Sequence, residues 1–227
     1  MTIKNSVAVG LTTLGLTAAA YADVSGSLTV TSNYLFRGIT QTDNHSAVQG
    51  SIDLTSDEGL YAGAWISNIA DGSEVDLYAG LIGELEEIRY DFGVVGYIYP
   101  NAKADANYTE LYATLGFQAF SAGVQYTIGS EVTDTNRGNE KFIAGDLYYF
   151  VSAHTPFYAD WEIAGTLGYY DFADDGVANK DTAYQHMEVS LSKAMYDLGT
   201  MTLALSKADK ESGNNNAQLS VSWSQSF

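Results

Sequence analysis

Apolar and polar residues alternate along most of the chain from residue 23 onward. Successive side chains of a β-strand point to opposite faces, so this alternation predicts strands with one apolar and one polar face. In the first such segment, 23–41, two sets of side chains would face apart: Leu28, Val30, Tyr34 and Phe36 on one side, and Thr29, Thr31, Asn33 and Arg37 on the other. After residue 22 no stretch of useful length has the period of a helix. The chain is therefore predicted to be all-β.

Twelve segments of this kind can be counted, and their connections differ in a regular way. The expected strands cover residues 28–36, 48–54, 60–67, 74–81, 88–98, 108–117, 122–128, 142–153, 161–170, 186–191, 200–206 and 219–227. The facing of the strand at 60–67 stays open, because this segment is apolar throughout. Longer polar loops, at 39–45, 68–73, 100–107, 129–141, 172–183 and 207–216, alternate with short turns, at 56–59, 84–87, 118–120, 155–157 and 194–197.

The strand count and the alternation of loop length together indicate one architecture. Single-chain barrels of the bacterial outer membrane have an even number of antiparallel strands, short periplasmic turns and longer outer loops. A soluble sandwich has no reason to place its long loops at one end only. We therefore predict a twelve-stranded antiparallel up-and-down transmembrane β-barrel in the bacterial outer membrane, with both termini on the periplasmic side.

Aromatic residues lie near the expected strand ends, where amphipathic rings form girdles at the two membrane interfaces. The outer girdle would consist of Tyr34, Phe36, Tyr97, Tyr99 and Tyr108, and the periplasmic girdle of Tyr61, Tyr90, Phe92, Phe117, Phe120, Phe157, Trp161, Trp223 and Phe227. The last strand alternates apolar residues and ends on Phe227, with Gln225 as an interruption. This ending resembles the C-terminal signal that the barrel assembly machinery reads, so that machinery is an expected partner.

The segment before the first strand has the features of a secretory signal peptide. Lys4 precedes an apolar run at 7–20, and Ala20-Tyr21-Ala22 forms a small-x-small cleavage site. The run is too short to span a bilayer as a helix. We expect residues 1–22 to be a signal peptide and residues 23–227 to be one barrel domain.

Composition excludes several functions. The chain has 28 acidic and 10 basic residues, a net charge of −18, and therefore lacks the basic surface that nucleic acid requires. It has no cysteine, which excludes disulfides, thiolate chemistry and cysteine-based metal sites.

The alternation places ten charged side chains on the polar face, which would be the inside of a barrel. These pore-lining candidates are Arg37, Asp53, Glu74, Asp76, Arg89, Asp91, Glu110, Asp146, Glu162 and Glu188. Acidic rings in a pore favour cations. The sequence thus predicts a channel for passive diffusion of small solutes that prefers cations, although the carboxylates could also only hydrate the interior or pair with basic groups.

Barrel size leaves an alternative open. About eight strands leave an interior filled by side chains and about sixteen leave an aqueous channel, and twelve lies between. Inward-facing Tyr112, Tyr148 and Tyr170 could narrow or plug the lumen. A barrel with a filled lumen would act as a structural, adhesion or lipid-facing protein, in contact with outer-membrane lipids and lipopolysaccharide.

The sequence supports an outer-membrane hydrolase or a metal site only weakly. A hydrolase needs a Ser–His or Asp–His arrangement, and His45, His154 and His186 stand in no motif of defined spacing, although His186 shares a face with Glu188 and Ser190. Acidic residues of one loop could attract calcium, but their spacing does not match a calcium-binding loop: Asp171, Asp174, Asp175 and Asp181, with Gly176. We expect no catalytic residue, no cofactor and no metal.

Three motifs resemble one protein family. SNYLFRGITQ at 32–41 is the most specific; the remaining two are Tyr61-Ala62-Gly63 with Trp65, Ser67 and Asn68, and EVDLYAG at 74–80. In these motifs the chain resembles the TorF-type outer-membrane porin family of proteobacteria (Gcw_chp), whose members are catalogued as conserved proteins of unknown function. The resemblance covers most of the mature chain. It implies an outer-membrane barrel regarded as a pore, and it carries no substrate, cofactor or catalytic residue.

Within the first motif, Arg37 stands out as one of only two basic groups among the pore-lining candidates. It could form a salt bridge at the rim that fixes the register of the strand, or mark a constriction near the outer mouth. The sequence leaves open which solute passes, whether outer loops fold inward, and whether the barrel forms a homo-oligomer.

Overall fold

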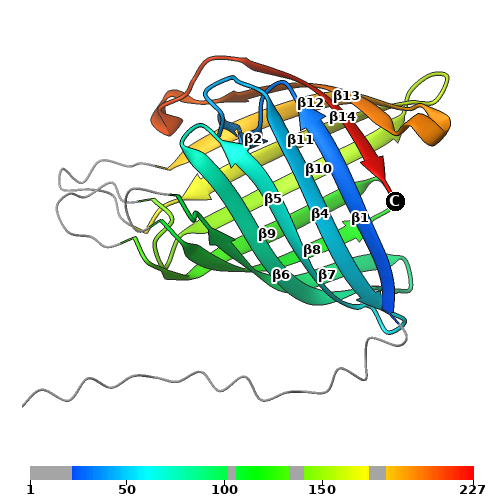
Figure 1. Ribbon diagram of the computed structural model, residues 1–227, viewed down its shortest axis with the longest axis horizontal. Helices are drawn as coiled ribbons and strands as arrows, with labels where there is room; N and C mark the ends of the chain where they lie inside the picture. Colours follow the sequence, from blue (N-terminus) through cyan, green and yellow to red (C-terminus); the bar gives the residue numbers. More distant parts are fainter. Residues whose placement is uncertain (1–21, 102–105, 133–140, 174–182) are drawn as a thin grey trace, which may run out of the picture.

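The computed structural model describes residues 22–101, 106–132, 141–173 and 183–227. Twelve antiparallel strands close into a barrel, in which each strand pairs with its neighbours along the chain and β1 pairs with β14 (Figure 1). The barrel strands are β1 (Ala22–Thr31), β4 (Ala47–Ser56), β5 (Leu60–Ile69), β6 (Gly72–Leu85), β7 (Ile88–Ile98), β8 (Tyr108–Phe117), β9 (Phe120–Ser130), β10 (Leu147–Pro156), β11 (Trp161–Asp171), β12 (Tyr184–Ala194), β13 (Thr200–Ala208) and β14 (Gln218–Ser226). The predicted all-β barrel is confirmed. The predicted signal peptide lies outside the described residues, apart from Ala22.

Helical structure is sparse in the described part of the chain. Two short 3-10 helices occur there, η2 (Tyr196–Leu198) and η3 (Lys210–Ser212). None of the described helices is long and apolar enough to cross a membrane.

The outer surface of the barrel is apolar, as the alternation predicts. Leucines of strands all around the barrel are exposed on it, among them Leu54, Leu111, Leu167 and Leu205. Exposed apolar side chains on every strand would be unfavourable in water, whereas lipid accepts them, and closure leaves no unpaired strand edge. The barrel therefore spans a membrane.

The strand whose facing the sequence left open can now be assigned. In β5, Leu60 and Ile66 are exposed on the lipid side. Ser67 is buried, and the hydroxyl of Tyr61 donates a hydrogen bond to Asp91 of β7 on the lumenal side of β6, which lies between the two strands (2.5 Å). Tyr61 was expected in the periplasmic girdle, and this prediction is wrong because its parity in β5 points it into the lumen.

The two ends of the barrel differ. The chain termini share one end, where Gly26 and Phe227 exchange backbone hydrogen bonds and where short connections lie at 57–59, 86–87, 118–119, 157–160 and 195–199. The other end carries the connections 32–46, 70–71, 99–107, 131–146, 172–183 and 209–217. The expected long loop at 68–73 is wrong: β5 and β6 stay paired to Ile69 and Gly72, and Gly72 permits a two-residue turn through its φ of 120°.

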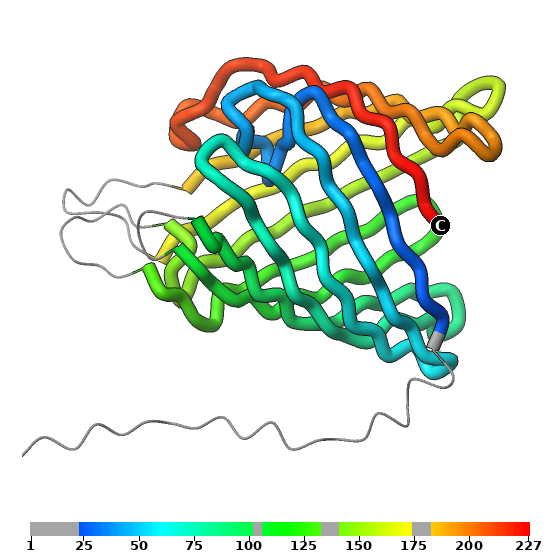
Figure 2. Tube along the Cα trace, in the orientation of Figure 1, coloured from blue at the N-terminus to red at the C-terminus, as the bar shows by residue number. Residues whose placement is uncertain are grey.

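The first strand ends earlier than its alternation predicts. β1 ends at Thr31, and residues 35–40 form a small separate hairpin of β2 (Leu35–Phe36) and β3 (Ile39–Thr40). In Figure 2 the blue segment after β1 turns back toward the barrel instead of extending outward. Tyr34 and Phe36 therefore do not face lipid, in contrast to the prediction.

The predicted outer aromatic girdle is also wrong. Tyr97 and Tyr108 are only 6% and 3% exposed, and their stacked rings lie inside the barrel, 4.4 Å apart. The hydroxyl of Tyr99 donates to the lumenal Glu74 (3.0 Å). At the periplasmic end the prediction holds better, since all five phenylalanines of that predicted girdle are exposed: Phe92, Phe117, Phe120, Phe157 and Phe227.

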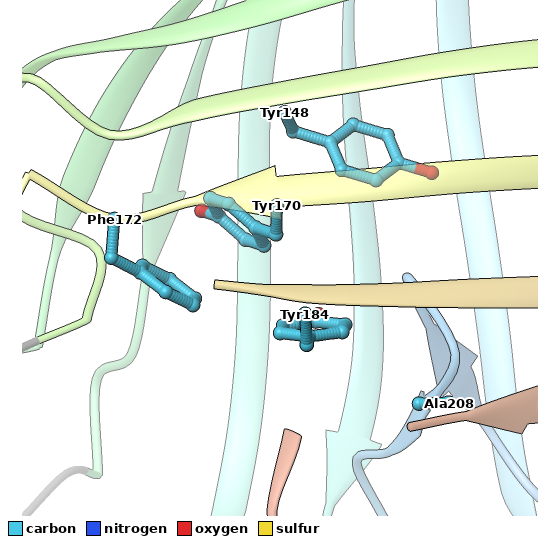
Figure 3. Packing of buried hydrophobic residues seen from close by; sticks show 5 residues of the cluster. All are labelled: Tyr148, Tyr170, Phe172, Tyr184 and Ala208. Carbon is cyan, nitrogen blue, oxygen red and sulfur yellow. The ribbon is translucent and has the colours of Figure 1, made fainter. Parts of the chain in front are cut away.

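The buried core of the molecule lies inside the barrel, in its outer half. One cluster joins rings from neighbouring strands and from the chain that follows β11: Tyr148, Tyr170, Phe172 and Tyr184, with Ala208 (Figure 3). A second cluster contains Val95, Tyr97 and Tyr108. The sequence predicted that Tyr148 and Tyr170 face inward, and this is confirmed.

Candidate functional site

The hairpin of the first outer loop, β2–β3, reverses direction at Arg37 and Gly38. Both residues have positive φ, 47° and 84°, a conformation that glycine adopts without steric cost. Gly38 also lies against the barrel wall: a Cβ at this position would be 2.5 Å from Cβ of His186 on β12. A glycine is therefore required at the tip for the hairpin to reach the wall.

Hydrogen bonds hold the hairpin to the inside of the barrel. After β1 ends, side-chain hydrogen bonds of Asn33 take the place of strand pairing. The side-chain oxygen of Asn33 accepts from the hydroxyl of Thr40 (2.6 Å), and its side-chain amide donates to Gln218 of β14 (3.4 Å). The hydroxyl of Tyr184 on β12 donates to the carbonyl of Arg37 (3.1 Å). The hairpin is thus fixed at its base and at its tip.

From this tip, the side chain of Arg37 crosses the lumen. Its guanidinium donates two hydrogen bonds to Glu110 of β8, at 2.9 and 2.5 Å, and a third to the side-chain oxygen of Gln125 on β9. In the order of strands around the barrel, β8 lies on the far side from β1 and β4, which the loop connects. The side chains of Arg37 and Glu110 are 4% and 1% exposed. A buried bidentate ion pair therefore links the first outer loop to the opposite wall.

Aromatic rings surround the guanidinium. Its central carbon lies 4.6 Å from the ring centroid of Phe36, 4.4 Å from that of Tyr148 and 4.8 Å from that of Tyr170. Such cation–π contacts strengthen when they are desolvated. Burial alone would lower the pKa of Arg37, but the Glu110 carboxylate raises this pKa well above its ordinary value, so the guanidinium stays charged.

Two further carboxylates lie in the outer half of the lumen, on β6. Glu74 accepts one hydrogen bond from Tyr99, while its other oxygen is buried without a partner among the described residues. One oxygen of Asp76 is in the same situation. Together with Glu110, these residues bring three carboxylates to a region where Arg37 supplies the positive charge.

On the periplasmic side of the buried Arg37–Glu110 pair, a chamber of about 550 Å³ occupies the periplasmic half of the lumen. Tyr97 and Gln125, which contact the Arg37–Glu110 pair, form its inner end. Ile82 lines its mouth and is 48% exposed although it faces inward, so the chamber is open to solvent at the periplasmic end. Asp53 and Asp91 line its wall.

The remaining pore-lining candidates lie apart from these two groups. Asp146 accepts backbone N–H groups of Ile143 and Ala173 and so ties two outer loops together; burial raises the pKa of Asp146, and these two hydrogen bonds oppose the rise. Glu188 is the candidate that β12 carries, opposite Thr166 of β11 and Ser206 of β13. Arg89 and Glu162 lie at the periplasmic rim, where Arg89 donates to the carbonyl of Gln118 (2.8 Å) and Glu162 contacts a histidine.

The hydrolase and metal-site hypotheses can be compared with the geometry. His186 bonds to the hydroxyl of Tyr148 (2.9 Å), and His154 lies 3.2 Å from Glu162. Within the described residues no hydrogen bond joins a histidine to a serine, and no group of acidic and histidine side chains is arranged to hold a metal ion. The acidic loop considered for calcium lies outside the described residues, apart from Asp171.

Sequence reasoning missed several residues of this site. Tyr97 and Tyr108 were assigned to a lipid interface because they lie at strand ends, although Tyr108 has the same parity as Glu110 and this signal placed it inside. Nothing in the sequence pairs Gln125 or Tyr184 with Arg37. These contacts depend on how far the first loop reaches into the lumen.

Comparison with solved structures agrees with this architecture. KdgM porin superposes with a TM-score of 0.59 at 10% sequence identity, covering 89% of this chain and 99% of the porin. NanC porin gives 0.53 at 12% identity, covering 89% and 98%. An outer-membrane channel from Pseudomonas putida F1 gives 0.53 at 12% identity, covering 91% and 96%. The molecule has the fold of outer-membrane porins, and it is a protein of the bacterial outer membrane.

The family can also be stated. The model of the family described as "Bacterial protein of unknown function (Gcw_chp)" matches residues 16–221, and the chain belongs to this family. The resemblance seen in the sequence motifs is thereby confirmed. No curated protein matches the sequence significantly.

Proposed function

We propose that this protein is an outer-membrane channel for passive diffusion of small solutes, whose permeability is set by the hairpin of its first outer loop. The observation that carries the proposal is the Arg37–Glu110 pair, which links the loop to the opposite wall across the lumen. In this arrangement buried side chains, among them Tyr170 and Glu110, occupy the outer half of the lumen, and the periplasmic half is open to solvent at Ile82. A shift of the hairpin would join the two halves into one path.

A preference for cations follows from the charges along that path. Of the ten candidates, Glu74 and Asp76 lie in the outer half and Asp53 and Asp91 line the chamber, while Arg37 and Glu110 neutralise each other. Carboxylates along a pore raise the local concentration of cations and oppose anions. Passage involves no covalent step, and we propose no catalytic residue, cofactor or metal.

Reversal potentials in planar bilayers under a KCl gradient test the selectivity. We expect cation-directed potentials, and we expect the combined change Asp53→Asn, Asp76→Asn and Asp91→Asn to move them toward zero. Glu162→Gln, at the exposed periplasmic rim, is the matched control and should leave them unchanged. Anion-directed potentials, or an unchanged preference in the triple variant, would contradict the proposed path.

A barrel with a permanently filled lumen is the second candidate, with a structural, adhesion or lipid-facing role. The extensive burial in the outer half of the lumen favours it, since Tyr170, Glu110 and Thr127 are almost inaccessible. It predicts no conductance in any variant that still folds. Conductance after removal of the hairpin would exclude it.

Lipids and the assembly machinery are the partners we propose for the outer surface. The apolar belt would contact outer-membrane lipids and lipopolysaccharide. Phe227 directly follows β14 at the periplasmic rim, with its ring exposed beside Gly26, where the barrel assembly machinery could bind it. Phe227→Ala should reduce the amount of barrel inserted in cells without changing the unfolding of the protein refolded in detergent.

A further inference from the structure

The periplasmic chamber has the size of a ligand-binding site and is open on its periplasmic side. Pockets that hold small molecules commonly have volumes of about 300–1,000 Å³, and the chamber has about 550 Å³. It is closed at its inner end by Tyr97 and Gln125 and open at Ile82. A molecule in the periplasm can therefore enter the chamber without passing the Arg37–Glu110 pair.

The charge of the chamber has one sign. Asp53 and Asp91 line it, and neither Lys nor Arg occurs among its described lining residues. The two nearby arginines are both engaged: Arg37, beyond the inner end, binds Glu110, and Arg89, at the rim, donates to the carbonyl of Gln118. A ligand with positive charge would therefore find two carboxylates without a cationic partner.

Tyrosine side chains position these carboxylates. Tyr78 donates to Asp53, Tyr61 donates to Asp91 (2.5 Å), and the hydroxyls of Tyr61 and Tyr112 bond to each other. Ser51 donates to the second oxygen of Asp53 (2.9 Å). The carboxylates are thus held in place before any ligand arrives, which reduces the ordering cost of binding.

The same tyrosines add ring surface to the wall. The rings of Tyr61 and Tyr78 lie with centroids 6.4 Å apart at an angle of 57°, and Tyr112 and Tyr97 also line the chamber. Aromatic rings attract ammonium groups through cation–π contacts and also cover the methylene groups attached to them. A bare metal ion would instead prefer several carboxylate ligands, and the described residues include no group of three or more acidic or histidine side chains that could hold one.

We propose that this chamber binds small organic ammonium ions that enter from the periplasmic side, with Asp53 and Asp91 as their counter-ions. The inference rests on the proposed function only in that the chamber is the inner vestibule of the same lumen. Binding itself requires no conduction, so a barrel that fails to conduct can still bind, and a conducting barrel can fail to bind.

Titration calorimetry on the mature barrel in detergent micelles tests this proposal, with 1,4-diaminobutane as the probe. The neutral 1,4-butanediol, of the same length, serves as its uncharged counterpart. We expect the diamine to bind with saturation and the diol not to bind. Equal binding of both would mean that hydrogen bonding to a polyol-like ligand dominates, and absence of diamine binding would overturn the site.

Variants locate the binding. The double change Asp53→Asn and Asp91→Asn removes the charges and keeps oxygens that accept the tyrosine hydroxyls, and it should raise the Kd about tenfold or more. Thr114→Trp, which fills the chamber without changing charge, should have a similar effect. Glu162→Gln is the control and should bind as the unmodified protein does. An unchanged Kd in both chamber variants, or an equal loss in the control, would contradict the assignment.

Discussion

Arg37 is held at the tip of a turn and not on a barrel strand, and this position explains how its side chain reaches the opposite wall. The positive φ of Arg37 and Gly38 brings the guanidinium to Glu110, between the rings of Tyr148 and Tyr170. One residue thus joins the first loop, the acidic wall and the aromatic core.

At this scale the first prediction concerns Gly38. Gly38→Ala introduces a Cβ at a φ of 84° and within 2.5 Å of His186. Gly213→Ala is a matched control, because its φ is 79° and nothing lies within 4 Å. Backbone strain alone costs about 1–3 kcal/mol, so the control should lower the free energy of unfolding modestly and Gly38→Ala by more, as measured by urea unfolding in micelles. Equal losses would mean that the hairpin tip does not contact β12.

The second prediction concerns the ion pair. Removal of one partner of a buried pair costs about 3–5 kcal/mol because the other charge stays buried. Arg37→Met alone should therefore destabilise the barrel strongly. The double change Arg37→Met and Glu110→Leu should recover much of that loss, because no charge is left unpaired. The same urea unfolding gives the coupling energy, and strictly additive effects would show that the two side chains do not interact.

At the scale of elements, the hairpin β2–β3 shows how far the sequence could predict the site. Parity grouped Arg37 with the pore-lining carboxylates, whereas the structure brings Arg37 to Glu110 from the tip of the hairpin and not from a strand. Parity could not show that β1 ends at Thr31, because Tyr34 and Phe36 continue the apolar alternation. The strand ends there because Asn33 bonds to Thr40, which lies beyond the hairpin turn, and to Gln218, which is distant in the sequence.

Contacts between residues distant in the sequence also explain why the outer aromatic residues were assigned to the wrong side of the barrel. The rule that rings gather at membrane interfaces assumes that a ring at a strand end faces lipid. In this barrel Tyr97 and Tyr108 face inward and pack around the inserted loop. By contrast, the strand count and the closed order were predictable, because they depend on the period of each segment and on chain connectivity alone.

A third prediction tests the attachment of the hairpin. Tyr184→Phe removes the hydrogen bond to the carbonyl of Arg37 and keeps the buried ring. A neutral hydrogen bond contributes about 1 kcal/mol, so local opening should become roughly fivefold more frequent. Hydrogen–deuterium exchange of residues 33–41 should therefore accelerate. Tyr149→Phe, on the exposed lipid side of β10, should leave it unchanged; equal exchange in both variants would argue against this anchor.

At the scale of the whole molecule, the lumen has two different walls. β6, β7 and β8 supply carboxylates and tyrosines, such as Glu74, Asp91 and Tyr97. β13 and β14 supply small hydroxyl side chains, including the buried Ser206 and Ser220. The small side chains leave space beside β1 for the inserted loop, while the opposite wall binds its arginine. The barrel therefore combines a wall rich in carboxylates with a first outer loop that is inserted into the lumen and bound to that wall through Arg37.

Single-channel conductance in planar bilayers tests that arrangement most directly. The comparison is between the mature protein and a variant in which residues 34–41 are replaced by a short Gly–Ser linker, with far-UV circular dichroism to verify that both barrels are folded. We expect low or intermittent conductance from the unmodified protein and a larger, steady conductance from the variant. Equal, steadily open conductance in both would contradict the closure of the outer half by the first loop.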